Sequence, residues 1–267
     1  MIYTNDIYYM KLNYTLNEHY FDSIDTEEKA YWLGFLYADG CISNNSIYFG
    51  QAENRADIVH KFIKALSITK PIKISYPKIG KPFYNCQIVS KILFNRLKEL
   101  GCIPNKSLIL TFNPDIIPKQ FINSFIRGYF DGDGCIWEGK RKIMLVKDNQ
   151  RKSGNRERII HNVKFTITGN YNFIINLQDY LCIQLGFKKT KLNFSKSKIK
   201  KNICTMEYSG RRQVKKFFDY IYNNATIYET NKRKKFENII CASTEKSVVE
   251  TALIEETPEM VIVSQAA

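Results

Sequence analysis

Two stretches of the sequence resemble each other and decide the fold. Ala30–Ile42 reads AYWLGFLYADGCI, and Ser124–Ile136 reads SFIRGYFDGDGCI. With an offset of 94 residues they align a glycine, Gly34 with Gly128, and both end in Asp-Gly-Cys-Ile. Self-similarity at a fixed spacing indicates that the chain is built from two related units.

The segments that follow the two stretches are also alike. In each half the hydrophobic period predicts a helix, two strands, a helix, two strands and a helix. The elements predicted in the first half are a helix over Lys29–Asp39, an alternating segment over Ser43–Gln51, a helix over Ala56–Leu66, strands over Ile72–Tyr76 and Tyr84–Val89, and a helix over Ile92–Leu100. Those that follow the second stretch are strands over Lys142–Val146 and Asn162–Thr168, a helix over Phe173–Leu185, strands over Lys191–Ser195 and Ile203–Tyr208, and a helix over Val214–Tyr222. A polar, basic insertion near residues 147–161 is predicted to form a long hairpin loop.

The chain is strongly basic, and the excess is uneven. Lys and Arg number 40 against 26 Asp and Glu, which gives a net charge of +14. Of the 40 basic residues, 24 lie in Trp137–Ile240 with only eight acidic residues, whereas Cys241–Ala267 carries five Glu and one Lys. A chain this basic usually binds a polyanion, most often nucleic acid. We therefore expect a nucleic-acid surface mainly in the second half, and we expect the acidic tail to be disordered or a fused segment.

Composition excludes several classes of protein. The 44% hydrophobic and 25% charged residues are an ordinary globular balance. No run of eighteen apolar residues predicts a membrane span, and the N-terminus lacks a secretory pattern. Seven cysteines without a C-x-x-C spacing and three histidines without ligand spacing argue against disulfides, zinc and a histidine base. We expect a protein that is not secreted and has no membrane partner, in the cytoplasm of a bacterial or phage host or in an organelle matrix.

Small residues recur on one face of each repeated helix. Gly34 and Ala38 lie one turn apart in Lys29–Asp39, and Gly128 and Gly132 do the same in the second copy. Glycine inside a helix costs about 1 kcal/mol relative to alanine. Because both copies accept this cost, we predict that the two helices pack on each other at close range.

Each helix is predicted to end in an aspartate followed by a glycine. Gly40 and Gly134 suit the left-handed conformation that often follows a helix C-terminus. Parallel packing would bring Asp39 and Asp133 together, and like charges at short range repel unless cations lie between them. Oxygen ligands without His or Cys favour Mg²⁺, with Mn²⁺ as a substitute. Ions held by so few carboxylates would bind substrate phosphate oxygens, as in metal-assisted phosphodiester hydrolysis.

The segments WLGFLYADG and FIRGYFDGDG resemble the two motifs of monomeric LAGLIDADG homing endonucleases, and the resemblance covers about Asp25–Ile240. Tyr37 replaces the first acidic residue of one motif and Arg127 replaces a small residue of the other, but neither position supplies the metal-binding carboxylate. The resemblance implies an α+β fold of two αββαββα halves related by a pseudo-twofold axis. The two motif helices would form the interface, and two four-stranded antiparallel sheets would form a saddle over the DNA major groove. We divide the chain into an N-terminal extension (1–28), a first half (29–122), a second half (123–240) and a tail (241–267).

The resemblance also implies an activity. The expected enzyme is a monomeric, metal-dependent, site-specific endonuclease that cuts double-stranded DNA across the minor groove. Its target would be long and asymmetric, and its products would carry short 3′ overhangs. The family places a basic residue near each active site, which PNKSLIL and ATIYETNKRKKF supply as Lys106 and Lys232. The predicted catalytic residues are Asp39, Asp133, Lys106 and Lys232, and the predicted metal ligands are Asp39, Asp133, Gly40 and Gly134; Asp131 is predicted to support the site rather than bind metal.

Outward side chains of the strands are the predicted DNA contacts. The run Lys188–Lys201 has seven lysines and no acid, and within it Leu192 and Phe194 alternate with polar residues, as in a half-buried strand with a polar outer face. In the major groove Arg or Lys can read guanine, and Asn or Gln can read adenine. The predicted DNA-binding residues are Asn44, Ser46, Tyr48, Lys73, Ser75, Asn85, Gln87, Lys140, Lys142, Lys164, Thr166, Thr168, Lys191, Asn193, Ser195 and Lys198.

Two other functions stay open at the level of sequence. The same basic surface could bind intron RNA as a maturase, or bind DNA as a regulator with an inactive site. Retention of both aspartates argues against the regulator and only mildly against the maturase. The expected context is a mobile intron, an intein or a phage genome, although the chain lacks protein-splicing ends. The basic insertion is either a solvated loop or a DNA contact.

Overall fold

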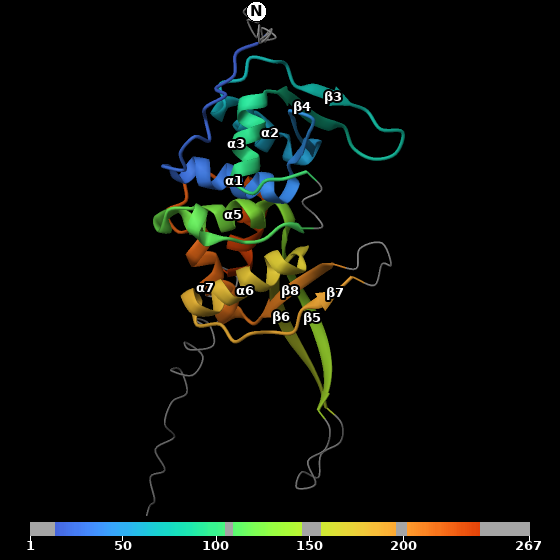
Figure 1. The fold of residues 1–267 in the computed structure, drawn as a ribbon. Coiled ribbons are helices and arrows are strands. Elements are labelled where there is room, and N and C mark those ends of the chain that lie inside the picture. The colour runs from blue at the N-terminus through green and yellow to red at the C-terminus, as the bar shows by residue number, and fades with distance from the viewer. Residues whose placement is uncertain (1–13, 105–108, 146–155, 196–201, 241–267) are drawn as a thin grey trace, which may run out of the picture.

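The computed structural model describes residues 14–104, 109–145, 156–195 and 202–240, and it arranges them as two halves that meet at a pair of helices (Figure 1). The first half contains α1 (Glu27–Asp39), β1 (Cys41–Ser43), β2 (Ser46–Ala52), α2 (Ala56–Ala65), β3 (Lys73–Ser75), β4 (Phe83–Val89) and α3 (Lys91–Glu99). The second half contains α5 (Ile122–Asp133), β5 (Gly134–Leu145), β6 (Arg156–Asn170), α6 (Tyr171–Leu185), β7 (Asn193–Phe194), β8 (Ile203–Ser209) and α7 (Arg211–Tyr222). A further helix covers residues 230–240, and short 3-10 turns lie at Glu53–Arg55, Pro114–Ile116 and Lys119–Phe121.

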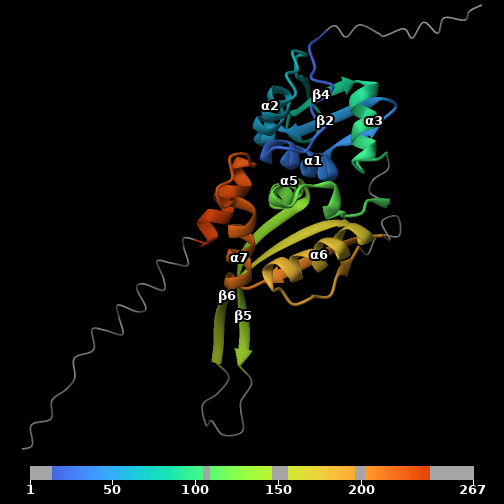
Figure 2. The ribbon, with the colours of Figure 1, turned by 60° about the vertical axis from the view of Figure 1, so that its left-hand side comes forward.

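Each half is built on one antiparallel sheet of four strands. The strand orders are β1-β2-β4-β3 and β5-β6-β8-β7, so the second sheet repeats the topology of the first. Helices cover one face of each sheet, and α1 and α5 lie together between the halves (Figure 2). The predicted α+β fold of two related halves is therefore confirmed. None of the described helices has both the length and the apolarity needed to span a bilayer.

Close contact between α1 and α5 depends on glycine. A Cβ atom added to Gly34 would lie 2.0 Å from the carbonyl oxygen of Phe125, and one added to Gly128 would lie 2.0 Å from that of Tyr31. A Cβ atom at Gly132 would lie 2.3 Å from the Cβ atom of Ala38. No larger side chain fits at these distances, so the predicted packing of the two repeated helices is confirmed.

Gly40 and Gly134, which follow these helices, do not adopt the conformation that was predicted. Gly40 has φ/ψ of −72°/144° and Gly134 has −90°/159°, so the prediction of a left-handed conformation is wrong. Both residues lead directly into the first strand of their sheet. A Cβ atom at Gly40 would lie 2.7 Å from the Leu36 carbonyl oxygen, and one at Gly134 would lie 2.1 Å from the ring of Phe130. Space, and not a positive φ angle, requires glycine here.

The long hairpin of the second sheet differs from the predicted loop. β5 and β6 pair without interruption from Gly134↔Ile167 to Leu145↔Arg156, so the prediction of a loop is wrong for residues 156–161. The outer part of this ribbon extends past the helices (Figure 1), where no core selects apolar side chains. The hydrophobic alternation that signals a strand is therefore missing. Residues 146–155 lie outside the described part of the chain, as does the acidic tail over 241–267.

Each half has its own aromatic core on the helix side of its sheet. In the first half Phe49 stacks on Phe62 at 4.3 Å between ring centroids, and in the second Phe165 stacks on Phe217 at 4.0 Å. Phe194 was predicted to be buried by strand alternation, but it is 54% exposed and stacks on Tyr171 at 5.6 Å. β7 is only two residues long. It lies at the edge of the sheet, where the alternation of apolar residues does not predict which side chains are buried.

Replacing Gly128 with alanine tests the helix contact. Helix propensity alone would stabilise this variant by about 1 kcal/mol. Contact of the new Cβ atom with the Tyr31 carbonyl should instead force the helices apart, and overpacking of this kind costs about 1–3 kcal/mol or more. We expect Gly128→Ala to lower the free energy of unfolding, measured by chemical denaturation. Gln184→Ala on the exposed face of α6 is the control and should change it little. A stabilised Gly128→Ala would contradict the backbone contact.

Candidate active site and nucleic-acid interface

The two predicted metal-binding aspartates are the last residues of α1 and α5, and the structure brings them together. A Cβ atom at Gly132 would lie 3.5 Å from Cγ of Asp39, so the end of α5 contacts the carboxylate of α1. Burial raises the pKa of the Tyr129 phenol well above its ordinary value, and the charges of Asp133 and Asp39 raise it further. Both carboxylates therefore lie near the same buried hydroxyl group, as the packing argument predicts.

Two polar side chains that sequence reasoning missed hold Asp39 in place. The Gln51 amide donates to Oδ2 of Asp39 at 2.8 Å, and the Arg55 guanidinium lies 3.8 Å from the same oxygen. Gln51 is buried although it occupies a strand position that should be apolar, after Ile47 and Phe49 on the inward face of β2. This break in alternation is the sequence signal that could have identified Gln51 as part of the site.

Arg55 also joins the two halves of the molecule. Its guanidinium donates to the Asp131 carbonyl oxygen at 2.6 Å and lies over the ring of Phe35 at 5.7 Å. It thus places a positive charge between the carboxylate at the end of α1 and the last turn of α5. Carbonyl groups in the last turn of a helix attract cations because of the helix dipole.

Lys232 lies at the end of α5, on the helix over residues 230–240. Its amino group donates to the carbonyl oxygens of Phe130, Asp131 and Gly134, each at 2.7 Å. Burial lowers the pKa of Lys232 to about 8, and the charges of Asp131 and Asp39 oppose this shift. Lys232 therefore caps α5 and lies close to Asp39. Its catalytic role stays a prediction, and Lys106 lies outside the described residues.

Asp131 supports this arrangement from the interior. It has no exposed surface, and its carboxylate accepts hydrogen bonds from the hydroxyl groups of Tyr31 and Tyr222 and from the backbone N–H of Glu229. Burial raises the pKa of Asp131, while the charge of Lys232 lowers it. With its oxygens satisfied by the protein, Asp131 orders the α5 turn that precedes Asp133, which agrees with the supporting role predicted for it.

The two departures from the motif pattern have structural partners. Arg127 is 1% exposed and donates to the carbonyl oxygens of Ile227 and Ile221 at 2.8 and 2.6 Å, and it forms an ion pair with Glu27 of α1. Tyr37 donates to the Leu100 carbonyl oxygen. Both side chains therefore tie a motif helix to the rest of the fold, and neither takes part in the carboxylate site.

Most of the predicted DNA contacts lie on the sheet faces that helices leave open or in adjoining turns. The exposed ones are Asn44, Tyr48, Lys73, Gln87, Lys191 and Asn193, and the partly exposed ones are Ser46, Ser75, Lys164, Thr166, Thr168 and Ser195. Each sheet thus presents a polar face opposite its apolar one, as the strand alternation predicts.

Four of the predicted DNA contacts differ from this description. Asn85 is buried, because its amide donates to the Ser75 hydroxyl group at 3.2 Å on the crowded sheet face. Lys140 is exposed, but its register on β5 matches Ile136, so it lies on the opposite face from Lys164. The Lys142 side chain and all of Lys198 lie outside what the structure describes.

The donor set at the two helix ends fits a magnesium-like ion. Within the described residues no group of three or more His, Cys, Asp or Glu side chains converges. Asp39 and Asp133 are the acidic side chains that end the two helices. The Asp39 side chain is 26% exposed and Asp133 is exposed. Gly40 is buried, and the Gly134 carbonyl already accepts from Lys232. A small all-oxygen set suits Mg²⁺, which keeps several waters when bound.

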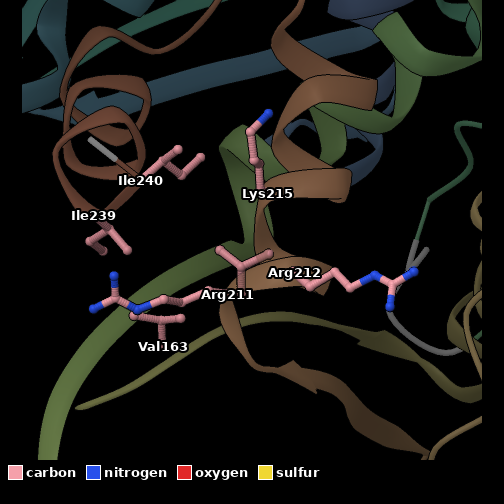
Figure 3. A pocket seen from close by; sticks show the side chains of 7 residues that line it. Val163, Arg211, Arg212, Lys215, Ile239 and Ile240 are labelled. Carbon is pink, nitrogen blue, oxygen red and sulfur yellow. The ribbon is translucent and has the colours of Figure 1, made fainter. Parts of the chain in front are cut away.

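A separate pocket lies on the helix side of the second sheet. It has a volume of about 220 Å³ between β6, α7 and the helix over 230–240 (Figure 3). It is lined by Val163, Arg211, Arg212, Val214, Lys215, Ile239 and Ile240. Figure 3 shows Arg211 and Arg212 pointing in opposite directions, so their charges do not converge on one ligand. None of the predicted site residues lines this pocket.

Fold and site together define a protein with two motif helices that end in aspartate, each leading into a four-stranded sheet. Residues 120–222 match the family model of the LAGLIDADG-like domain. This part of the chain is therefore similar to a LAGLIDADG-like domain, and the resemblance predicted from the two motifs is confirmed.

Solved structures with the same fold cover both halves. The LAGLIDADG meganuclease I-AabMI, bound to uncleaved DNA, has a TM-score of 0.51 and 16% identity over 83% of this chain and 91% of its own. The LAGLIDADG homing endonuclease I-LtrWI, bound to target DNA, has a TM-score of 0.52 and 10% identity. The match covers 89% of this chain and 100% of that one. The homing endonuclease I-WcaI, bound to its DNA recognition sequence, has a TM-score of 0.52 and 14% identity. The match covers 79% of this chain and 87% of that one. At these identities the likeness establishes the fold.

One curated relative shares part of the sequence. It is the DNA-directed RNA polymerase subunit Rpo1C of Methanocaldococcus jannaschii, which is 26% identical over 126 residues. The match covers 46% of this chain but only 14% of that much longer relative.

The lowered pKa of Lys232 predicts a pH dependence of stability. Between pH 8 and 10.5 the unfolded chain keeps the proton on this lysine while the folded chain releases it. Stability relative to a Lys232→Met variant should therefore rise with pH across this window, by roughly 2 kcal/mol. Chemical denaturation at pH 8, 9 and 10 measures the difference. Lys234→Met, at an exposed position on the same helix, is the control, and identical pH profiles for wild type and Lys232→Met would contradict the prediction.

Proposed function

We propose that this protein is a sequence-specific double-strand DNA endonuclease that hydrolyses phosphodiesters with Mg²⁺, or Mn²⁺ as a substitute. The observation that carries the proposal is the convergence of Asp39 and Asp133 at the ends of two helices in backbone contact. A stable core alone gives no reason to place two carboxylates there, because the last turn of a helix disfavours negative charge. Oxygen ligands for a cation that also binds phosphate give such a reason.

Within this proposal each residue has a distinct part. Asp39 and Asp133 would hold the ion, which would supply positive charge at the phosphate and make the attacking water more acidic. Gln51 and Arg55 fix the Asp39 carboxylate, and the Arg55 cation lies where a scissile phosphate would approach. Lys232, with a pKa near 8, keeps the end of α5 in place and offers a cation for the developing negative charge.

DNA as the substrate is supported by charge and by shape. The basic excess lies in the second half, and both sheets carry a polar open face. The endonucleases of the same fold that are named above were solved with DNA. We propose that the chain acts as a monomer on a long asymmetric target, because its two halves carry different outward side chains. We further propose that the cleaved DNA carries short 3′ overhangs. The protein would belong to a mobile intron, an intein or a phage genome.

Cleavage of a randomised double-stranded DNA library tests the function directly. The full chain is incubated with the library in Mg²⁺, in Ca²⁺ and in EDTA, and the ends produced are sequenced. We expect staggered cuts at one motif in Mg²⁺ only. Enrichment of a sequence without cuts in any metal would replace the enzyme with a DNA-binding regulator. If neither cutting nor enrichment occurs, binding of intron RNA against random RNA at matched salt tests the maturase.

Removal of either carboxylate should separate cleavage from binding. Asp39→Asn and Asp133→Asn should each lower the cleavage rate at least about 100-fold, because a donor to the metal ion is lost. The DNA dissociation constant in Ca²⁺ should stay within about threefold, since the sheet faces are unchanged. Asp219→Asn on the exposed face of α7 is the control and should affect neither quantity. Equal loss of binding and cleavage would show that the aspartates hold the fold and not a metal.

A further inference from the structure

Three side chains form a cluster on the open face of the second sheet. The Lys164 amino group lies 2.8 Å from Oε2 of Glu207 and 5.5 Å from the ring centre of Trp137. The Lys164 and Glu207 side chains are 30% and 32% exposed. The three residues come from β6, β8 and β5, so the cluster spans three neighbouring strands.

Strand register places the cluster on the face that would meet DNA. Trp137 pairs with Lys164 across β5 and β6, and Thr166 pairs with Glu207 across β6 and β8. On β6 and β8 the residues that alternate with them, such as Phe165 and Met206, face the helices and are fully buried. Side chains on the opposite face therefore point to the open side of the sheet.

Neither stability nor phosphate attraction explains Glu207. Exposed ion pairs contribute little to folding stability. A carboxylate on a basic surface also weakens its attraction for the phosphate backbone. Glu207 is one of only eight acidic residues against 24 basic ones in Trp137–Ile240, and it lies among the predicted DNA contacts. A role in selecting a base accounts for its position.

We propose that Lys164 and Glu207 together read one G·C base pair in the major groove, an inference that rests on the proposed DNA function. Lys164 would donate to O6 and N7 of guanine, and Glu207 would accept from N4 of cytosine. O6 and N4 are hydrogen-bonded to each other within the base pair, at about 2.9 Å. The 2.8 Å between the Lys164 and Glu207 atoms matches that spacing.

An A·T pair fits the same two side chains less well. Its edge presents the donor N6 between two acceptors, N7 and O4, and ends in the thymine methyl group. A carboxylate placed on N6 would face the lone pair of N7, and a lysine placed on O4 would face the methyl group. The G·C edge presents two adjacent acceptors, N7 and O6, followed by one donor, N4. A lysine beside a glutamate complements this order.

Trp137 and Gly139 prepare the lysine for this contact. A Cβ atom at Gly139 would lie 2.1 Å from ring carbons of Trp137, so glycine leaves the space in which the indole lies along β5. The ring supports the Lys164 cation from one side. A lysine already held in place loses less side-chain entropy when it binds a base.

The corresponding positions of the first half carry different chemistry. In the first sheet Cys41 pairs with Tyr48, which pairs with Gln87, and in the second Cys135 pairs with Thr166, which pairs with Glu207. Glu207 thus corresponds to Gln87, and by the same register Lys164 corresponds to Ser46. The ion pair belongs to one half only, so one half of the target should show this G·C requirement.

Selection from a randomised duplex library tests the proposal. The full chain is used in Ca²⁺ at one fixed salt concentration, as wild type and as Glu207→Met, Lys164→Met and Glu138→Met. We expect a G·C pair at one position of the wild-type site. Glu207→Met should reduce the preference for G·C over T·A at that position roughly tenfold, and Lys164→Met should weaken it at the same position.

Glu138→Met is the matched control because it removes the same charge from the same sheet. Glu138 is exposed, but its register on β5 places it on the opposite face from Trp137. It should alter affinity uniformly and leave the base preference unchanged. An unchanged preference in Glu207→Met, or a change spread evenly over all positions, would overturn the base-reading pair and leave the endonuclease proposal intact. A wild type that enriches no sequence would overturn both.

Discussion

Backbone contact between α1 and α5 is the constraint on which the rest of the structure depends. Gly34 and Gly128 each allow a carbonyl oxygen of the other helix to approach closely. The two helices therefore pack as one unit at the centre of the molecule, and each leads into its own sheet. The direction in which each helix ends then fixes where its sheet begins. The same contact brings two carboxylates, which would otherwise stay apart, to one end of the pair. Fold and candidate chemistry therefore share one cause.

The repeat is symmetric in topology but not in its polar contacts. α5 carries Arg127 and Asp131 where α1 carries Leu33 and Tyr37. Both side chains of α5 are buried, and both form hydrogen bonds with the backbone of residues 221–229, which precede the helix over residues 230–240. Charged groups in the interior are tolerated only when they are fully bonded. These groups hold the helix over residues 230–240 against α5, and that helix presents Lys232. Arg127, which departs from the motif, and the acidic Asp131, which Tyr37 replaces in α1, thus position the helix that presents Lys232.

Much of this arrangement could be predicted from the sequence, and the failures have physical reasons. The repeat predicted the helix pair, the two related halves and the aspartate at the end of each motif helix, because small residues at helical spacing and Asp-Gly ends are local signals. The outer part of β6 was missed, because a ribbon beyond the core needs no hydrophobic alternation. Arg55 and Glu207 were missed because only folding brings them to Asp39 and Lys164. Gln51 was missed although its polar side chain breaks the apolar alternation of β2.

Repulsion between the two aspartates is a weaker argument for a metal ion than the sequence suggested. The folded chain already supplies cations of its own, since the Arg55 guanidinium lies 3.8 Å from Asp39 and Lys232 binds the last carbonyl groups of α5. These charges offset the repulsion while the protein is free, so the helix pair can close without bound metal. The argument for a metal rests on the convergence of the two aspartates, and their exposure adds to it. Asp131 is buried, whereas Asp39 is partly exposed and Asp133 is exposed. Under the proposed function, a site whose charges the protein's own cations already balance would receive ion and substrate without rearrangement, as a preorganised site requires.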